Sequence, residues 1–133
     1  MRRIRLIICV AVALSLLTLT AVAYAAANYA GRTSQHAPIS LTVSAGAVRK
    51  IHFTIYIKCP SGHKYAIAAK GFPAIKIANG KFAEKFVALH ASATATIKGK
   101  VRPRRVTGSV FLRNYENPEH HFCSATARFD LRR

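Results

Sequence analysis

Residues 48–59 read VRKIHFTIYIKC, a run in which apolar and polar side chains alternate with a period of two. The apolar set, which ends in a cysteine, is Ile51, Phe53, Ile55, Ile57 and Cys59. Because a β-strand points successive side chains to opposite faces, this alternation predicts a strand with one face in a core and the other toward water.

The same pattern recurs along the chain, and turn residues separate the segments. Further strands are predicted at ISLTV (39–43), KYAIAAK (64–70), ATATIKGKV (93–101), VTGSVFL (106–112) and FCSATARFDL (122–131). Asn79-Gly80 predicts a two-residue hairpin turn between AIKIA and KFAEKFV, because both turn residues tolerate positive φ. Eight or nine short strands without a convincing helix predict an all-β fold, a single antiparallel β-sandwich or small barrel.

Residues 81–89, KFAEKFVAL, allow two interpretations. A strand would place Glu84 on the same face as Phe82 and Phe86, whereas a short amphipathic helix would group Phe82, Phe86 and Leu89. The Asn-Gly turn immediately before this segment favours the strand.

Residues 1–25 are expected to be a signal peptide that takes no part in the fold. Three arginines precede an apolar run over residues 6–23, and Ala23-Tyr24-Ala25 has the small residues of a cleavage site. The alternative is an uncleaved membrane anchor, because roughly 18 apolar residues can span a bilayer. In both cases residues 26–133 are expected outside the cytoplasm as one exported β-domain.

This domain is strongly basic. The chain has 21 Lys and Arg against four Asp and Glu, and three of the arginines lie in the expected signal peptide. The remaining formal charge of +14 predicts attraction to anionic surfaces and no particular fold.

The cations are most concentrated around the predicted turn RPRR, residues 102–105. The candidate polyanion-binding residues are outward positions of two adjoining strands and the turn between them: Lys98, Lys100, Arg102, Arg104, Arg105 and Arg113. The alternative is that a domain of this charge carries cations evenly over its whole surface.

The chain carries, in this order, the fragments YAGRTSQ, ISLTVSAGAVRKIHFTI, Cys59-x-x-Gly62, ANGKF, ATATIKGKV, VTGSV and CSATARF. From Tyr29 to Phe129 they resemble a group of small exported two-cysteine β-domain proteins of high-GC Gram-positive bacteria. The resemblance implies export, a run of strands and a disulfide, and it implies no catalytic residue. The sequence departs from that group at His36, where Gly is expected, and at Phe129, where Trp is usual.

Cys59 and Cys123 are the two cysteines outside the expected signal peptide. Paired thiols usually oxidise outside the cytoplasm, and both residues share the parity of the apolar positions on their strands. We therefore expect a disulfide between them. A zinc site with His63 and His121 remains an alternative, as do free or intermolecular thiols.

The segment ENPEHH, residues 116–121, also offers potential metal ligands. Asn117-Pro118 favours a turn, so the segment is interpreted as a solvated hairpin loop and no metal site is expected.

Catalysis needs a matched acid and base or an activated nucleophile. The domain has four carboxylates, at Glu84, Glu116, Glu119 and Asp130. It has no serine elbow, Gly-rich phosphate loop or His-Glu-x-x-His run. We expect no enzymatic activity and no cofactor.

The expected function is that of a secreted or cell-envelope-associated module that binds anionic envelope polymers or another exported protein. Specific recognition of nucleic acid is not expected, because Phe111 is the sole aromatic residue with outward parity near the cations. One alternative is a structural or assembly component of the cell exterior whose sheet edges pair with partners. Another is a small exported hydrolase.

Overall fold

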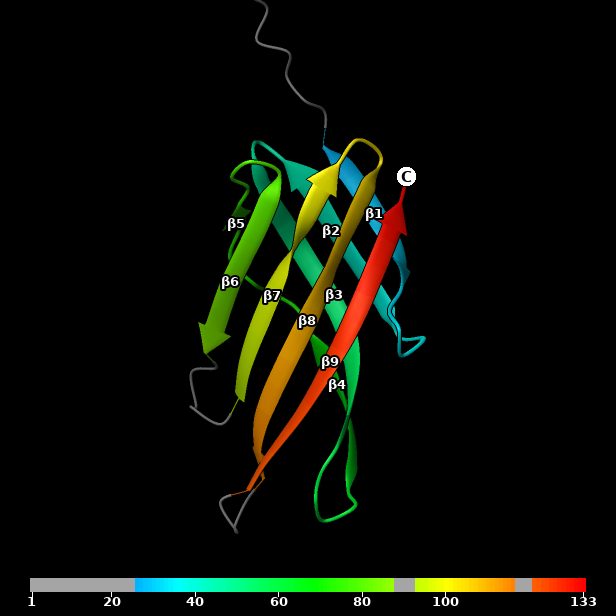
Figure 1. The fold of residues 1–133 in the computed structure, drawn as a ribbon, viewed down its shortest axis with the longest axis vertical. Coiled ribbons are helices and arrows are strands. Elements are labelled where there is room, and N and C mark those ends of the chain that lie inside the picture. Colours follow the sequence, from blue (N-terminus) through cyan, green and yellow to red (C-terminus); the bar gives the residue numbers. More distant parts are fainter. Residues whose placement is uncertain (1–25, 88–92, 117–120) are drawn as a thin grey trace, which may run out of the picture.

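The computed structural model describes residues 26–87, 93–116 and 121–133, which form two antiparallel sheets facing each other (Figure 1). The first sheet holds, in chain order, β1 (Ala27–Arg32), β2 (Pro38–Ser44), β3 (Ala47–Lys58) and β4 (Lys64–Ala69), and the short β5 (Ile75–Lys76) also pairs with β3. The second sheet holds β6 (Lys81–Val87), β7 (Ala93–Arg102), β8 (Arg105–Glu116) and β9 (His121–Arg132).

This arrangement confirms the predicted all-β sandwich, and it confirms the strand interpretation of residues 81–87. The expected signal peptide, Leu89 and most of the predicted loop 116–121 lie outside the described residues. In the part of the chain that the structure describes, no helix has the length and apolar character needed to cross a membrane.

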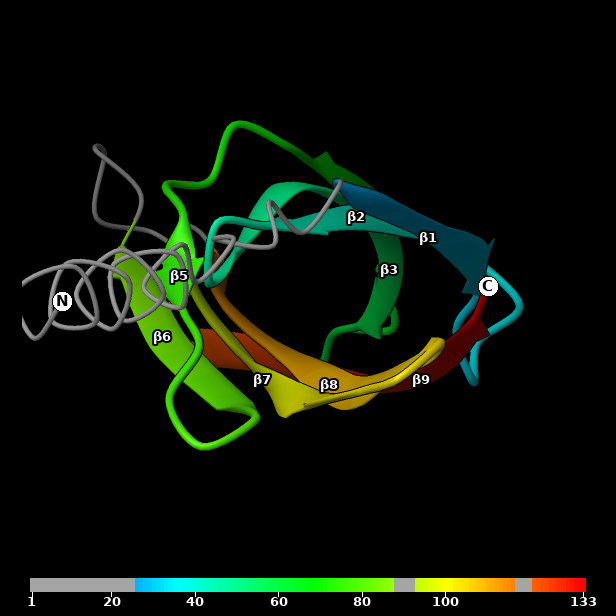
Figure 2. The ribbon, with the colours of Figure 1, turned by 90° about the horizontal axis from the view of Figure 1, so that it is seen from above.

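The two sheets approach each other along both of their sides (Figure 2). On one side Thr33, just after β1, forms a bridge with Phe129 of β9, and the Ser34 amide donates to the Arg128 carbonyl at 2.7 Å. On the other side the chain passes from β5 to β6 through Asn79 and Gly80, and the Val101 amide donates to the Gly80 carbonyl. The sandwich is therefore partly closed, in the direction of a barrel.

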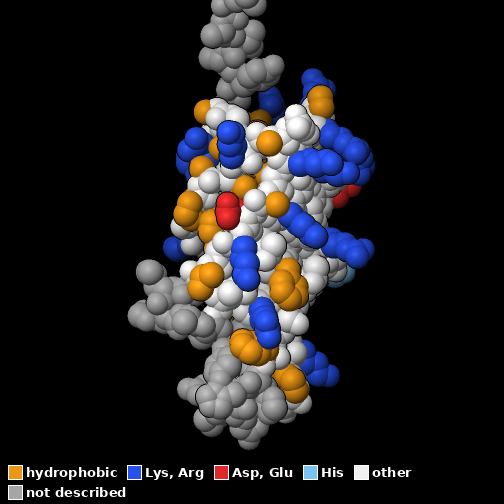
Figure 3. All heavy atoms as spheres, turned by 60° about the vertical axis from the view of Figure 1, so that its left-hand side comes forward, with side chains coloured by type: hydrophobic (Ala, Val, Ile, Leu, Met, Phe, Trp, Pro, Cys, Tyr) orange, Lys and Arg blue, Asp and Glu red, His pale blue; other side chains and the backbone are white. Residues whose placement is uncertain are grey.

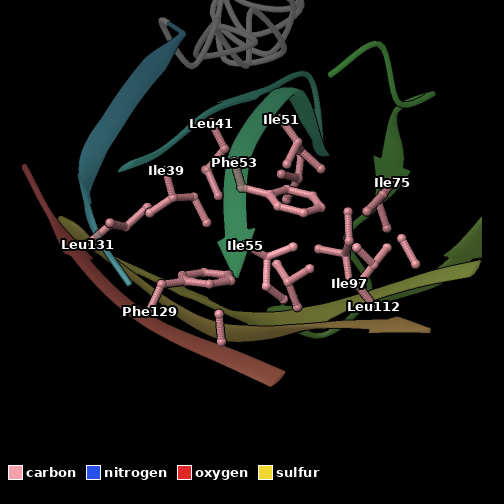
Figure 4. Close-up of a cluster of buried hydrophobic side chains, with 14 of the residues drawn as sticks. Ile39, Leu41, Ile51, Phe53, Ile55, Ile75, Ile97, Leu112, Phe129 and Leu131 are labelled. Atoms are coloured by element: carbon pink, nitrogen blue, oxygen red, sulfur yellow. The ribbon is translucent and has the colours of Figure 1, made fainter. Parts of the chain in front are cut away.

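The core lies between the sheets and is built from the period-two apolar positions that the sequence predicts (Figure 4). The first sheet contributes a row along β3, in which Ile51, Ile55 and Ile57 are at most 1% exposed. The second sheet contributes residues from β6 to β9, among them Phe82, Ile97, Val110, Phe129 and Leu131. Removal of these side chains from water is the main favourable contribution to folding.

The Asn79-Gly80 turn forms with φ angles of 51° and 71°, as the sequence predicts. The segments on either side, however, do not pair as a hairpin beyond the single bridge between Ala78 and Lys81. β5 pairs with β3, and β6 pairs with β7, so the turn connects the two sheets. The predicted hairpin between AIKIA and KFAEKFV is wrong, because side-chain burial on opposite sheets competes with local pairing.

The turn at His36 forms although glycine was expected there. The Thr33 amide donates to the Ala37 carbonyl at 2.9 Å, and His36 adopts a φ of 59°. That φ lies in the left-handed region, which glycine adopts without steric cost and other residues adopt with some strain.

A disulfide joins Cys59, just after β3, to Cys123 of β9, and it thereby links the two sheets. Both cysteines are buried, with exposures of 3% and 2%. The expected disulfide is confirmed, and the alternatives of a zinc thiolate site and free thiols are excluded for this pair.

We predict that the double variant Cys59→Ala/Cys123→Ala loses about 4 kcal/mol of unfolding free energy, because the disulfide closes a loop with a sequence separation of 64. Urea unfolding of the oxidised protein and the variant measures the difference. Coincident unfolding midpoints for the two proteins would contradict the prediction.

Candidate anion-binding site

On the outward face of the β6–β9 sheet, residues that are paired in neighbouring strands form rows across the four strands. One row is Lys81, Lys100, Thr107 and Asp130, and the next is Ala83, Lys98, Ser109 and Arg128. The cations at outward positions of this sheet are Lys81, Lys85, Lys98, Lys100, Arg102, Arg105, Arg113, Arg128 and Arg132. Among the side chains that the structure describes, Asp130 is the sole carboxylate at an outward position of these strands.

The outward face of β1–β4 has a different character. Its strands carry the exposed cations Arg32, Arg49, Lys50, Lys58 and Lys64, and positions between them hold small residues such as Ala30, Ser40 and Ala68. Figure 3 shows Lys and Arg side chains along the length of the molecule on a side that includes β6, with few acidic side chains among them. The β6–β9 sheet thus carries more cations at outward positions than the β1–β4 sheet, while exposed cations occur on both sheets.

A shallow basin of about 750 Å³ lies in this basic face. Five cations line it: Lys76 of β5, Lys81 of β6, and Lys98, Lys100 and Arg102 of β7. Thr107 and Ser109 of β8 add two hydroxyl groups, and no carboxylate belongs to the lining. The basin thus offers hydrogen-bond donors and uncompensated positive charge to an anion.

The floor of the basin is formed by two paired glycines, Gly99 of β7 and Gly108 of β8. A Cβ on Gly99 would lie 2.3 Å from the Thr107 carbonyl oxygen, and a Cβ on Gly108 would lie 2.3 Å from the Lys98 carbonyl oxygen. No side chain fits at either position, so the two backbones approach each other as only glycine allows.

On the core side, aromatic rings cover both glycines. Phe82 and Phe129 are the outer members of the row Phe82, Gly99, Gly108 and Phe129. Each ring comes within 2.6 Å of the place where a Cβ on its neighbouring glycine would lie. The rings fill the space that the missing side chains leave, which is a known way to support glycine in a sheet.

Arg105 and Asp130 form a bidentate ion pair at the edge of the basic face. Arg105 donates from Nε to Oδ1 at 2.8 Å and from Nη2 to Oδ2 at 2.6 Å. The hydrogen bonds from Arg105 hold the pKa of the Asp130 carboxyl below its usual value, and the charges of Arg105 and Arg132 act in the same direction. Arg105 is therefore largely neutralised by its partner.

Arg113 lies away from the basin, nearer the other end of the sheet. Its guanidinium carbon is 3.7 Å from the centroid of the Phe122 ring, a cation–π contact. Phe111, two positions before Arg113 on β8, is 38% exposed, as the predicted outward parity requires. Phe122 is a second exposed aromatic residue on this face, which the sequence interpretation did not include.

Of the six predicted polyanion-binding residues, the structure brings three together at the basin, namely Lys98, Lys100 and Arg102. Arg104 lies in the β7–β8 turn with a φ of 58°. Arg105 is paired with Asp130, and Arg113 stacks on Phe122.

Sequence reasoning missed four members of the basin: Lys76, Lys81, Thr107 and Ser109. Lys81 directly precedes the buried Phe82 in the chain, so strand parity could have predicted that Lys81 points outward. Lys76 offered none, because its strand belongs to the other sheet.

Outside residues 1–25, 88–92 and 117–120, no group of three or more His, Cys, Asp or Glu side chains is placed to hold a metal ion. The disulfide removes both thiols from any ligand set. Ser61 Oγ lies 3.0 Å from His63 Nδ1 in the exposed turn after β3.

Comparison of the chain with protein-family models, with curated proteins and with solved structures gives no match.

We predict that Gly108→Ala lowers the free energy of unfolding by about 1–3 kcal/mol, the usual cost of overpacking. The new methyl group would meet the Lys98 carbonyl and the Phe129 ring, and the β7–β8 register would have to shift. Thermal unfolding provides the measurement, and Ser109→Ala, which changes an outward side chain one position further on, is the control. Equal stability of the two variants would show that the fold does not require glycine at position 108.

Proposed function

We propose that the protein is a non-enzymatic module that binds a phosphate-bearing polyanion on the outward face of the β6–β9 sheet. The observation that carries this proposal is the basin, where five cations from three strands surround one concavity that no carboxylate lines. Lysine and arginine side chains bind phosphate oxygens through charge-assisted hydrogen bonds, and the two hydroxyl groups add neutral donors.

The spacing of the cations fits a chain better than a single small anion. Lys98 and Lys100 are two residues apart on one strand, a separation of about 7 Å, and Lys81 lies directly opposite Lys100 on the neighbouring strand. Arg128 and Arg132 extend the positive charge across β9. A linear polymer with regularly spaced phosphates can contact several of these positions at the same time.

Recognition by base stacking is poorly supported. Single-strand binding surfaces usually combine cations with several exposed aromatic rings. On this face Phe111 stands in one row with Thr96 and Lys85, and the Phe122 ring is covered by Arg113. Nucleic acid is therefore expected to bind only through its phosphates, without sequence preference.

The Cys59–Cys123 disulfide is compatible with a location outside the cytoplasm. Together with the expected signal peptide, it supports the proposal that the protein is secreted or associated with the cell envelope. The polyanion would then be a phosphodiester polymer of the envelope.

We predict that the protein binds duplex DNA, used as a test polyanion, with a log–log salt slope of about −4 to −5, because the basin holds about five phosphate-neutralising cations. Replacement of Lys81, Lys98 and Lys100 with Ser should reduce the magnitude of this slope by about 2 to 3. Fluorescence anisotropy at a series of salt concentrations measures both slopes.

The matched control replaces three cations of β3, Arg49, Lys50 and Lys58, with Ser. This variant has the same net charge as the basin variant, and all three positions are exposed on the other sheet. Its slope should stay close to that of the unchanged protein. Equal losses in the two triple variants would mean that the polyanion binds through overall charge, with no preferred site.

We predict that Asp130→Asn increases the affinity for the same DNA and steepens the slope by up to about 0.9, because Arg105 loses its neutralising partner. The lowered pKa of Asp130 keeps this carboxylate charged at mildly acidic pH, so the difference between variant and unchanged protein should be the same at pH 7 and pH 5. An unchanged slope or weaker binding by the variant would contradict the prediction that Arg105 belongs to the basic face.

A further inference from the structure

The four long edges of the two sheets are not equally protected. An edge strand presents unpaired backbone groups to any extended chain, and proteins usually block such edges with charges, bulges or coverage. The residues that follow β1 are bonded to β9 through Thr33 and Ser34, so these two edges meet. β6 carries Lys81 and Lys85 on its outward face, and Glu84 stands exposed at an inward position.

β4 carries charge only at its two ends, Lys64 and the adjoining Lys70, and its middle has neither a charge nor a bulge. It pairs with β3 in an unbroken register from Lys58–Lys64 to Phe53–Ala69, and with no other strand in the part of the chain that the structure describes. Residues 65–69, Tyr-Ala-Ile-Ala-Ala, contain no charge and no proline. The edge is regular and alternating, and no strand among the described residues pairs with its outer side.

Two cavities adjoin this edge, one toward each end. A hollow of about 430 Å³ is lined by Tyr56, Lys58, Lys64, Tyr65 and Ala66. A larger apolar cavity of about 570 Å³ lies between the sheets, where its lining includes Ile67, Ala69, Phe72, Phe86 and Val87. Strand-addition sites obtain their specificity from such hollows, which receive alternate side chains of the bound segment.

The charge at the two ends of the edge indicates what kind of segment fits. Lys64 begins β4, Lys70 follows its last residue, and both are exposed. They stand about 20 Å apart along the strand, and Lys58 pairs with Lys64. A second copy of the chain would bring lysines against these lysines, which opposes self-pairing, whereas carboxylates at the same places would be attracted.

We propose that β4 binds an extended segment of another protein as an added strand of the first sheet. The segment carries apolar side chains at alternate positions, which enter the cavity beside Ile67 and Phe86. It carries carboxylates at its two ends, about six residues apart, opposite Lys64 and Lys70. The surface lies on a different sheet from the basin, and the proposal is independent of polyanion binding.

The test uses the disulfide-bonded protein and a synthetic peptide, acetyl-Glu-Val-Thr-Val-Thr-Val-Glu-amide. Binding is measured by titration calorimetry, with the same peptide ending in Lys at both sides as the reference. We expect the acidic peptide to bind and the Lys-ended peptide to bind at least about tenfold more weakly. Equal affinity for the two peptides would overturn the assignment of carboxylate ends.

Backbone pairing is tested with two further acidic peptides, one N-methylated at residues 2, 4 and 6 and the other at residues 3 and 5. An added strand turns alternate amides toward its partner, so one of these peptides should lose binding and the other should keep it. Unchanged binding of both would overturn strand addition and leave only electrostatic contact.

The protein side is tested with Lys64→Glu/Lys70→Glu, which should bind the acidic peptide about tenfold more weakly and gain affinity for the Lys-ended peptide. The control, Arg49→Glu/Lys50→Glu, makes the same change in net charge on β3 and should leave both affinities unchanged. Equal weakening by the two double variants would overturn the proposal, because the peptide would then respond to overall charge.

Sedimentation of the protein alone should show a monomer. A dimer that depends on β4 would assign the edge to a second copy instead.

Discussion

The pairing of Gly99 with Gly108 fixes the register of β7 against β8, and both faces of the second sheet depend on that register. Beneath the pair, the rings of Phe82 and Phe129 occupy the space that two side chains would otherwise take. On the outward side, the two glycines lie between the row of Lys98 and Ser109 and the row of Lys100 and Thr107, and they belong to the lining of the basin. A shift of the pairing register by one residue would turn the buried side chains of a strand outward and its outward side chains inward. The core and the basin therefore both require this register.

The two sheets share one core but present different outward faces. Cations follow the rows of the β6–β9 sheet, whereas the middle of the β1–β4 face is built from small and hydroxyl-bearing residues. The disulfide and the bridge between Thr33 and Phe129 hold the sheets together without using either face. The two proposed partners, a polyanion and an extended protein segment, would therefore bind to different sheets.

Most of the fold was predictable because it depends on the period-two alternation of buried side chains, which the sequence displays directly. The row from Ile51 to Ile57, the Cys59–Cys123 disulfide and the turn at Asn79 were all predicted from parity and turn chemistry. Three features were not. β1 buries little more than Tyr29 and was not among the predicted strands. The bulge between β2 and β3, at Leu41 and Lys50, breaks the period.

The third feature is the membership of β5 and β6 in different sheets, because a local turn does not report which distant strand its arms will join. The same limit applies to the basin. Lys98 and Lys100 were identified from strand parity. Lys76 lines the same basin because the chain crosses from the first sheet to the second just after β5. The sequence does not show that Gly99 and Gly108 are paired, because their pairing depends on the register of β7 against β8.

The central claim, that the outward face of the second sheet is a polyanion site centred on the glycine pair, is most directly tested by an NMR titration with a short phosphodiester oligomer that lacks bases. The account predicts amide shift changes concentrated at residues 98–102 and 107–109 and at Lys76 and Lys81, with little change along β1 and β2. Small changes spread evenly over exposed residues of both sheets would contradict it.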